Sequence, residues 1–126
     1  MKVRVLTSLP ILLASVAIII ASSRQDIQLP DLGLWNTDKL LHLIAYFFYG
    51  IFLLIFINGN FKLSKGKTIL IAIVVGLLFA ASDEWHQSFV PGRTASIYDF
   101  IADAIGIALS TIFNTKIAAA LNKIFN

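Results

Sequence analysis

Apolar residues are grouped along the chain into four long runs, separated by short polar segments. The runs cover residues 5–21, 40–57, 68–85 and 97–113. A helix needs roughly 17 to 25 residues to cross about 30 Å of hydrocarbon, and each run is close to that length. The pattern therefore predicts an all-α membrane protein in which four transmembrane helices form a bundle and residues 1–126 form a single domain.

The segment after the fourth run, residues 114–126, is too short and too polar to form another span. Its apolar side chains recur at Ile117, Leu121, Ile124 and Phe125. This spacing predicts a short amphipathic tail that lies on the membrane surface.

The first run also has features of a cleavable signal peptide. Lys2 and Arg4 precede it, and the small residues Ala21, Ser22 and Ser23 end it. The run is long for a signal core, and keeping it gives an even number of spans with both chain ends on the same side. We expect it to remain as the first transmembrane helix.

Composition supports a membrane class. The 126 residues are 58% hydrophobic and only 13% charged, which is more apolar than an ordinary globular domain. The absence of cysteine excludes disulfides, thiolate metal ligands and cysteine nucleophiles. The net charge of +3 does not indicate a nucleic-acid partner, because the basic residues are scattered beside the apolar runs. The lipid bilayer is the predicted partner.

Charged residues are segregated between the two ends of the predicted helices. Seven basic residues lie at the end that the positive-inside rule assigns to the cytoplasm: Lys2, Arg4, Lys62, Lys65, Lys67, Lys116 and Lys123. All acidic residues lie at the other end: Asp26, Asp31, Asp38, Asp83, Glu84, Asp99 and Asp103. Acidic residues contribute little to membrane insertion, so this segregation indicates a local purpose. Both chain termini are predicted to be cytoplasmic.

Helical periodicity turns the polar residues toward one another. Asp38, His42 and Tyr46 share one face of the second predicted helix. Asp99 and Asp103 are one turn apart on the fourth, on a face that continues with the small residues Ala102, Gly106 and Ser110. Small residues at this spacing let helices approach closely, so both aspartates are predicted to point into the bundle.

The segment between the third and fourth runs contributes a turn and an arginine. Asp83 and Gln87 share a helix face, and the turn at residues 91 and 92 brings Arg93 over the acidic residues. A capping box at the start of the fourth helix, formed by Ser96 and Asp99, is an alternative explanation of Asp99 but not of Asp103. Polar groups near hydrocarbon are costly, so residues 82–103 are predicted to form a functional site.

Two stretches resemble the signature blocks of the VanZ-like family of bacterial membrane proteins, named for a teicoplanin-resistance accessory protein. They are DKLLHLIAYFFYG at 38–50 and SDEWHQSFVPGRTASIYDFIADAIG at 82–106. The characteristic positions are Asp38, Lys39, His42, Tyr46, Asp83, Glu84, Gln87, Phe89, Arg93, Asp99, Asp103 and Gly106. The resemblance implies a place in the bacterial inner membrane, a role in the cell envelope and lowered susceptibility to a lipoglycopeptide antibiotic. It names no reaction.

Two hypotheses give the polar residues a chemical role. In the first, a lipid-modifying enzyme would use acid–base or metal chemistry, with catalytic candidates His42, Asp83, Glu84, Asp99 and Asp103. A divalent cation would then be held by Asp83, Glu84, Asp99 and Asp103. In the second, the site would bind a lipid-linked envelope precursor, a glycopeptide or a protein partner, with binding candidates Arg93, Gln87, Tyr46, Asp38 and Lys39. Its aromatic rim would be Trp35, Tyr46 and Trp85.

Two further alternatives stay open. The polar residues could only neutralise one another and lock the helices together. Proton-coupled transport is the least favoured hypothesis, because the polar residues stop at one end and four helices need at least a dimer for alternating access. The sequence leaves open whether the protein is a homo-oligomer.

Overall fold

The computed structural model describes residues 2–25 and 37–125, and every regular element in this part of the chain is helical. The elements are α1 (Lys2–Ser22), α2 (Thr37–Asn60), α3 (Lys65–Gln87), α4 (Ile97–Ser110), the 3₁₀ turn η1 (Thr111–Phe113) and α5 (Asn114–Phe125). Four stretches are long and apolar enough to cross a membrane: α1, α2, α3 and the continuous segment from α4 to α5. The predicted all-α, four-span architecture is confirmed.

The helices extend beyond the apolar runs. α2 begins at Thr37 and α3 ends at Gln87, so the polar residues at both positions belong to regular helix. The tail is also helical, and only the single turn η1 separates α5 from α4. Asn114 at the start of α5 is buried, and α5 packs against α2. The tail thus begins as part of the bundle.

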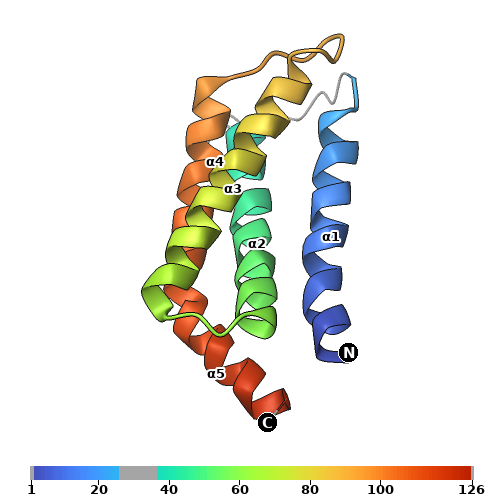
Figure 1. Cartoon of the computed structure of the whole chain (residues 1–126). Coiled ribbons are helices and arrows are strands. Elements are labelled where there is room, and N and C mark those ends of the chain that lie inside the picture. Colours follow the sequence, from blue (N-terminus) through green and yellow to red (C-terminus); the bar gives the residue numbers. More distant parts are fainter. Residues whose placement is uncertain (1, 26–36, 126) are drawn as a thin grey trace.

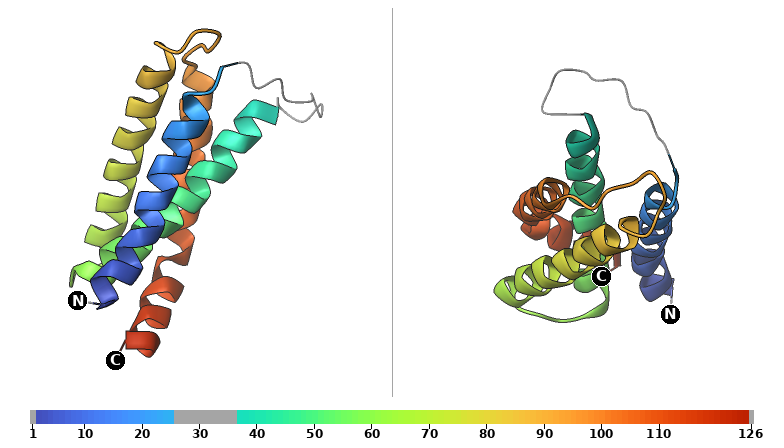
Figure 2. Two further views of the ribbon diagram at one scale, coloured as in Figure 1. Left: turned by 90° about the vertical axis from the view of Figure 1, so that its right-hand side faces the viewer. Right: turned by 90° about the horizontal axis from the view of Figure 1, so that it is seen from above.

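α2 is the central helix, in contact with α1, α3, α4 and α5 (Figures 1 and 2). The two described ends of the chain and the α2–α3 connection lie at one end of the bundle, and the α3–α4 connection lies at the other (Figure 1). We call these the basic end and the polar end, because Lys62 and Lys65 lie at the first and the predicted site residues at the second.

The core combines aliphatic packing with aromatic stacking. Leu54 of α2 and Ile107 of α4 are almost fully buried, and the Tyr49 and Phe79 rings stack with centroids 4.5 Å apart. Many large apolar side chains are nevertheless exposed, among them Leu78 at 67%. Exposure of so much apolar surface fits a helix bundle surrounded by lipid.

Small residues bring α4 close to α2, as the periodicity predicted. A Cβ atom on Gly106 would lie only 2.8 Å from the backbone nitrogen of Phe47. Ala102 and Ser110, one turn to either side, have no exposed surface. This close approach places the first turns of α4 against the first turns of α2, where the polar residues lie.

Two side-chain hydrogen bonds join helices at the basic end. The Asn58 amide donates to Oδ1 of Asn114 over 2.8 Å, and the Asn60 amide donates to the Thr7 hydroxyl over 2.9 Å. These contacts tie α5 and α1 to the last turns of α2.

Candidate functional site

The predicted site residues come together at the polar end, and we call them the polar cluster. Its members are Asp38, Lys39, His42, Tyr46, Asp83, Glu84, Gln87, Arg93, Asp99 and Asp103. α2 contributes four residues, α3 three, α4 two and the α3–α4 connection one. The inward orientation predicted for Asp99 and Asp103 is confirmed, because both are buried.

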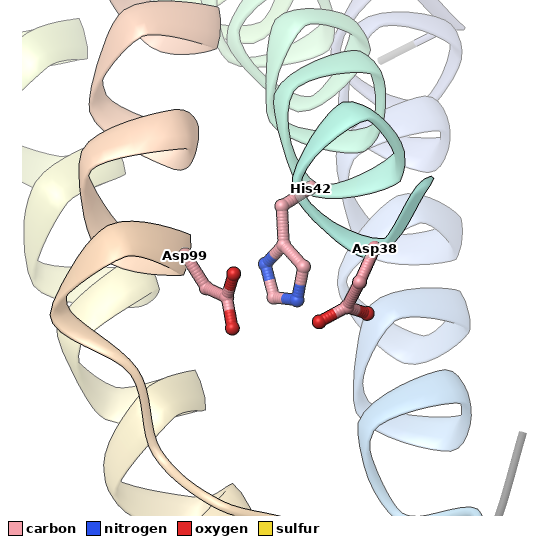
Figure 3. Close-up of side chains that lie close together, drawn as sticks. All are labelled: Asp38, His42 and Asp99. Carbon is pink, nitrogen blue, oxygen red and sulfur yellow. The ribbon is translucent and has the colours of Figure 1, made fainter. Parts of the chain in front are cut away.

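His42 lies at the centre of the cluster. Its Nδ1 is 2.9 Å from Oδ1 of Asp103 and 3.9 Å from Oε1 of Glu84. On α2 and α4, the carboxylates of Asp38 and Asp99 lie to either side of the imidazole ring (Figure 3). A carboxylate at Nδ1 fixes the orientation of an imidazole, which suits both acid–base chemistry and metal ligation.

Lys39 forms an ion pair with Asp99, with its Nζ 2.9 Å from Oδ1. The lysine side chain is 16% exposed and the aspartate 5%. The alternative of a capping box is wrong, because the Ser96 side chain makes no capping hydrogen bond. The Ser96 backbone N–H instead donates to Oε2 of Glu84 over 2.8 Å, which ties the start of α4 to the end of α3.

Asp83 accepts hydrogen bonds from three helices. The Ser22 hydroxyl of α1 donates to Oδ1, and the Tyr46 hydroxyl of α2 donates to Oδ2 over 3.1 Å. The Gln87 amide, one turn along α3, donates to Oδ2 over 3.4 Å, which confirms that Asp83 and Gln87 share a face. Three donors satisfy most of this buried carboxylate.

Arg93 makes its hydrogen bond to an amide rather than to a carboxylate. Its guanidinium donates to Oε1 of Gln87 over 2.9 Å, and the side chain is half-buried. Among the described residues, the arginine has no ion pair with the acidic residues of the cluster. The prediction that the turn brings Arg93 to the cluster holds, while its charge stays available.

A cavity of about 130 Å³ lies beside the cluster. Its polar lining is Ser22, Asp38, His42, Tyr46, Asp83, Gln87 and Arg93. Its apolar lining is Ile18, Ala21, Leu41 and Ala45 from α1 and α2. Such a volume holds a polar group of several atoms.

The predicted all-carboxylate cation set does not assemble. Within the residues that the structure describes, two groups have ligand atoms within 4.8 Å of one another. They are Asp38, His42 and Asp99, and His42, Glu84 and Asp103. Asp83 belongs to neither group, because its oxygens face Ser22 and Tyr46 instead.

The predicted aromatic rim also needs correction. Tyr46 lines the cavity but is only 1% exposed, so it is a buried residue and not part of an exposed rim. Trp85 is exposed and packs edge-on against Phe89, with ring centroids 5.4 Å apart. Trp35 lies outside the described residues.

Sequence reasoning missed the contribution of α1. Ser22 reaches Asp83, and the hydroxyl of Ser23 lies 2.9 Å from Nε2 of His86. From the sequence alone, both serines fit only the small residues that end the first apolar run. The one available signal was a pair of hydroxyls at the polar end of an apolar helix, which is too common a feature to assign a partner.

A protein-family model matches most of the chain. The family model VanZ/LLP1 matches residues 4–117, which include nearly all of α1, the whole of α2, α3 and α4, the polar cluster and the first turn of α5. The chain belongs to the VanZ/LLP1 family. The comparisons with curated proteins and with solved structures gave no match.

The positions that carry the resemblance to the VanZ-like family have different structural roles in this chain. All ten residues of the polar cluster are among them, and Gly106 is where α4 packs on the α2 backbone. Phe89 is different, because it is exposed and contacts Trp85. In this chain, these positions therefore combine polar groups at one end of the bundle with the close crossing of α4 on α2.

Proposed function

We propose that this VanZ/LLP1 protein binds an anionic lipid of the cell envelope, with Arg93 taking the phosphate and the α1–α2 side of the cavity taking the adjoining apolar chain. The observation that carries the proposal is the position of Arg93. Among the described cations of the cluster, Arg93 alone both lines the cavity and has a neutral hydrogen-bond partner.

The charge of Arg93 is available because Gln87 positions the guanidinium without neutralising it. Lys39 has its charge matched by Asp99 instead. A guanidinium presents several N–H donors in a plane, and one bond to Gln87 leaves donors for phosphate oxygens. The carboxyamide of Gln87 is in turn held by Asp83, so the arginine is oriented before a ligand binds.

The apolar part of the ligand fits the opposite lining. Ala21 of α1 and Leu41 and Ala45 of α2 line the cavity and are themselves exposed, so the cavity opens between these two helices. In a bundle surrounded by lipid, an opening between helices faces acyl chains. A ligand with an anionic head and an apolar tail would place each part against matching groups.

The positive-inside rule supplies the orientation of the proposal. Lys62, Lys65 and Lys67 surround the connection at the basic end, and such loops face the cytoplasm. The polar cluster would then face the outer leaflet of the bacterial inner membrane, where envelope lipids and lipid-linked precursors are displayed.

Native mass spectrometry tests the binding proposal. Wild-type protein released from micelles is expected to carry phosphatidic acid and not diacylglycerol, which has the same apolar part without the phosphate. Arg93→Gln is expected to weaken phosphatidic acid binding at least about tenfold, because a charge-assisted hydrogen bond is lost. Arg24→Gln is the matched control, since Arg24 is exposed and does not line the cavity. Equal binding by all three proteins would overturn the proposal.

The same experiment separates binding from turnover. Phosphatidic acid recovered with unchanged mass supports a binding protein. Recovery as diacylglycerol and inorganic phosphate would assign hydrolysis, with His42 as the first residue to substitute because it lines the cavity and is oriented by Asp103.

A lipoglycopeptide antibiotic combines an apolar chain with a polar head and is a further ligand of the proposed type. Expression in a susceptible bacterial host is expected to raise the teicoplanin concentration needed for inhibition. The Arg93→Gln variant at the same membrane abundance is expected to lose this effect. An equal effect of both proteins would separate resistance from the cavity.

Helix locking is a second candidate function for part of the cluster. Asp83 joins α1, α2 and α3 through Ser22, Tyr46 and Gln87, and Lys39 joins α2 to α4 through Asp99. Helix locking would be favoured as the main role by two results together: the Asp83→Ala variant fails to fold, and the folded Arg93→Gln variant binds lipid normally.

A further inference from the structure

The carboxylates of the polar cluster outnumber its cations. Five carboxylates belong to it, whereas Lys39 and Arg93 are its permanent positive charges and His42 can supply a third. The cluster therefore has an excess of at least two negative charges when all five carboxylates are ionised. Buried charges in proteins are paired or coordinate metal ions, so such an excess needs a counterpart.

Hydrogen-bond partners locate where the excess lies. Asp83 is satisfied by three donors, and Asp99 by Lys39. Asp38 is only half-buried and lines the cavity, so its charge does not require a buried counterpart. Glu84 uses Oε2 for the Ser96 N–H, and Asp103 uses Oδ1 for His42. Two buried oxygens have no hydrogen-bond partner among the described residues, Oε1 of Glu84 and Oδ2 of Asp103.

Both oxygens belong to residues that surround one ring nitrogen of His42. Glu84 is 7% exposed and Asp103 is not exposed at all. Oε1 of Glu84 lies 3.9 Å from Nδ1 of His42, and Oδ1 of Asp103 lies 2.9 Å from the same nitrogen. One ligand atom from each of the three residues lies within 4.8 Å of the others. Atoms this close can be joined by a single ion with bonds of about 2.0 to 2.2 Å.

We propose that His42, Glu84 and Asp103 bind a divalent transition-metal cation. One imidazole and two carboxylates form a donor set that suits Zn²⁺, Mn²⁺ or Fe²⁺, whereas Ca²⁺ and Mg²⁺ prefer oxygen ligands alone. A cation bound to Nδ1 of His42 would replace the proton between this atom and Asp103, give Oε1 of Glu84 a partner and offset the negative charge of the cluster.

The neighbouring residues fit this assignment. The Asp38 carboxylate lies across the imidazole ring from Asp99, where it can orient the ring of a metal-bound histidine (Figure 3). The alternative trio of Asp38, His42 and Asp99 is less suited to a cation, because Asp99 is already paired with Lys39 and two of its three members are only half-buried.

The cation site and the lipid-binding cavity are separable. Of the three proposed ligands, His42 alone lines the cavity. Binding of phosphatidic acid through Arg93 is therefore measured in EDTA, and metal binding is measured without lipid. Failure of one proposal then leaves the other standing.

The test uses Mn²⁺ binding to the EDTA-treated, purified full-length protein in detergent micelles. Electron paramagnetic resonance is expected to show one bound Mn²⁺ per chain, and spin-echo modulation is expected to show coupling to an imidazole nitrogen. The chain contains only two histidines, His42 and His86. His86 is exposed at the end of α3, so His86→Gln is expected to fold and to keep the nitrogen coupling, which then comes from His42.

Carboxylate variants complete the test. Glu84→Gln and Asp103→Asn are expected to weaken Mn²⁺ binding by about a hundredfold or more, because each removes a ligand. Asp99→Asn makes the same charge change one turn away on α4, beside His42 but outside the proposed ligand set, and is expected to weaken binding less than either ligand variant, by about tenfold. The proposal would be overturned if the His86→Gln variant bound none of Mn²⁺, Co²⁺ and Zn²⁺. It would also be overturned if this variant bound Mn²⁺ without nitrogen coupling. A shared proton would then be the counterpart of the two oxygens.

Discussion

The fully buried carboxylate of Asp103 in α4 is within hydrogen-bond distance of the imidazole of His42 in α2, with Oδ1 and Nδ1 2.9 Å apart. The pair lies where α4 crosses closest to the first half of α2, so it connects the packing of the bundle to the chemistry of the polar cluster.

A double-mutant cycle measures this relationship. His42→Ala and Asp103→Ala are each expected to destabilise the protein by about 3 kcal/mol in EDTA, because either change leaves a buried polar partner unpaired. The double variant is expected to recover about 2 kcal/mol relative to the sum. Unfolding by sodium dodecyl sulfate in mixed micelles gives the three free energies. Effects that add would show that the two side chains act independently.

The glycine contact between α2 and α4 makes a second prediction. Gly106→Ala is expected to lower the free energy of unfolding by about 2 kcal/mol, since the new methyl group meets the α2 backbone. Gly66→Ala is the control, because a Cβ there has no atom within 4 Å. Better helix propensity should make the control neutral or more stable by at most about 1 kcal/mol. Similar losses at both glycines would contradict the close crossing.

The Tyr46 hydroxyl is expected to stabilise the protein through Asp83. Tyr46→Phe keeps the buried ring but removes the donor at 3.1 Å, at a cost of about 1.5 kcal/mol. Tyr98→Phe removes an exposed hydroxyl and should change stability by less than about 0.5 kcal/mol. Thermal unfolding of the two variants in the same detergent checks the difference, and equal transition temperatures would argue against this hydrogen bond.

The packing of α5 depends on the amide pair at the basic end. Asn114→Ala removes the acceptor for the Asn58 amide and is expected to cost about 1 kcal/mol. Amide hydrogen exchange within α5 should become faster in this variant. Thr115→Ala, at the exposed neighbouring position, should leave exchange unchanged. Unaltered exchange in both variants would mean that α5 is held by other contacts.

The orientation in the membrane is tested by single cysteines, which the chain allows because it has none of its own. Thr94→Cys lies in the connection at the polar end and Ser64→Cys in the connection at the basic end, and both positions are exposed. A membrane-impermeant maleimide added to intact spheroplasts is expected to label the first and spare the second. The reverse pattern would invert the proposed topology.

Sequence by itself determined the helices, the separation of charge between their ends and the inward faces of α2, of α4 and of the end of α3. Hydrophobic length and helical periodicity are local properties, so Asp103 and Gly106 could be assigned to the packed face of α4 without knowledge of any neighbour. The resemblance to the VanZ-like family implied in addition that the polar residues belong together.

Only the tertiary structure decided which polar groups are partners. Lys39 pairs with Asp99, Arg93 is held by Gln87 and Ser22 reaches Asp83 from α1. These pairings depend on the distance and rotation between helices that are far apart in sequence, and periodicity contains no information about either. The same physical reason explains why the unpartnered oxygens of Glu84 and Asp103 around His42 emerged only once α2, α3 and α4 were packed together.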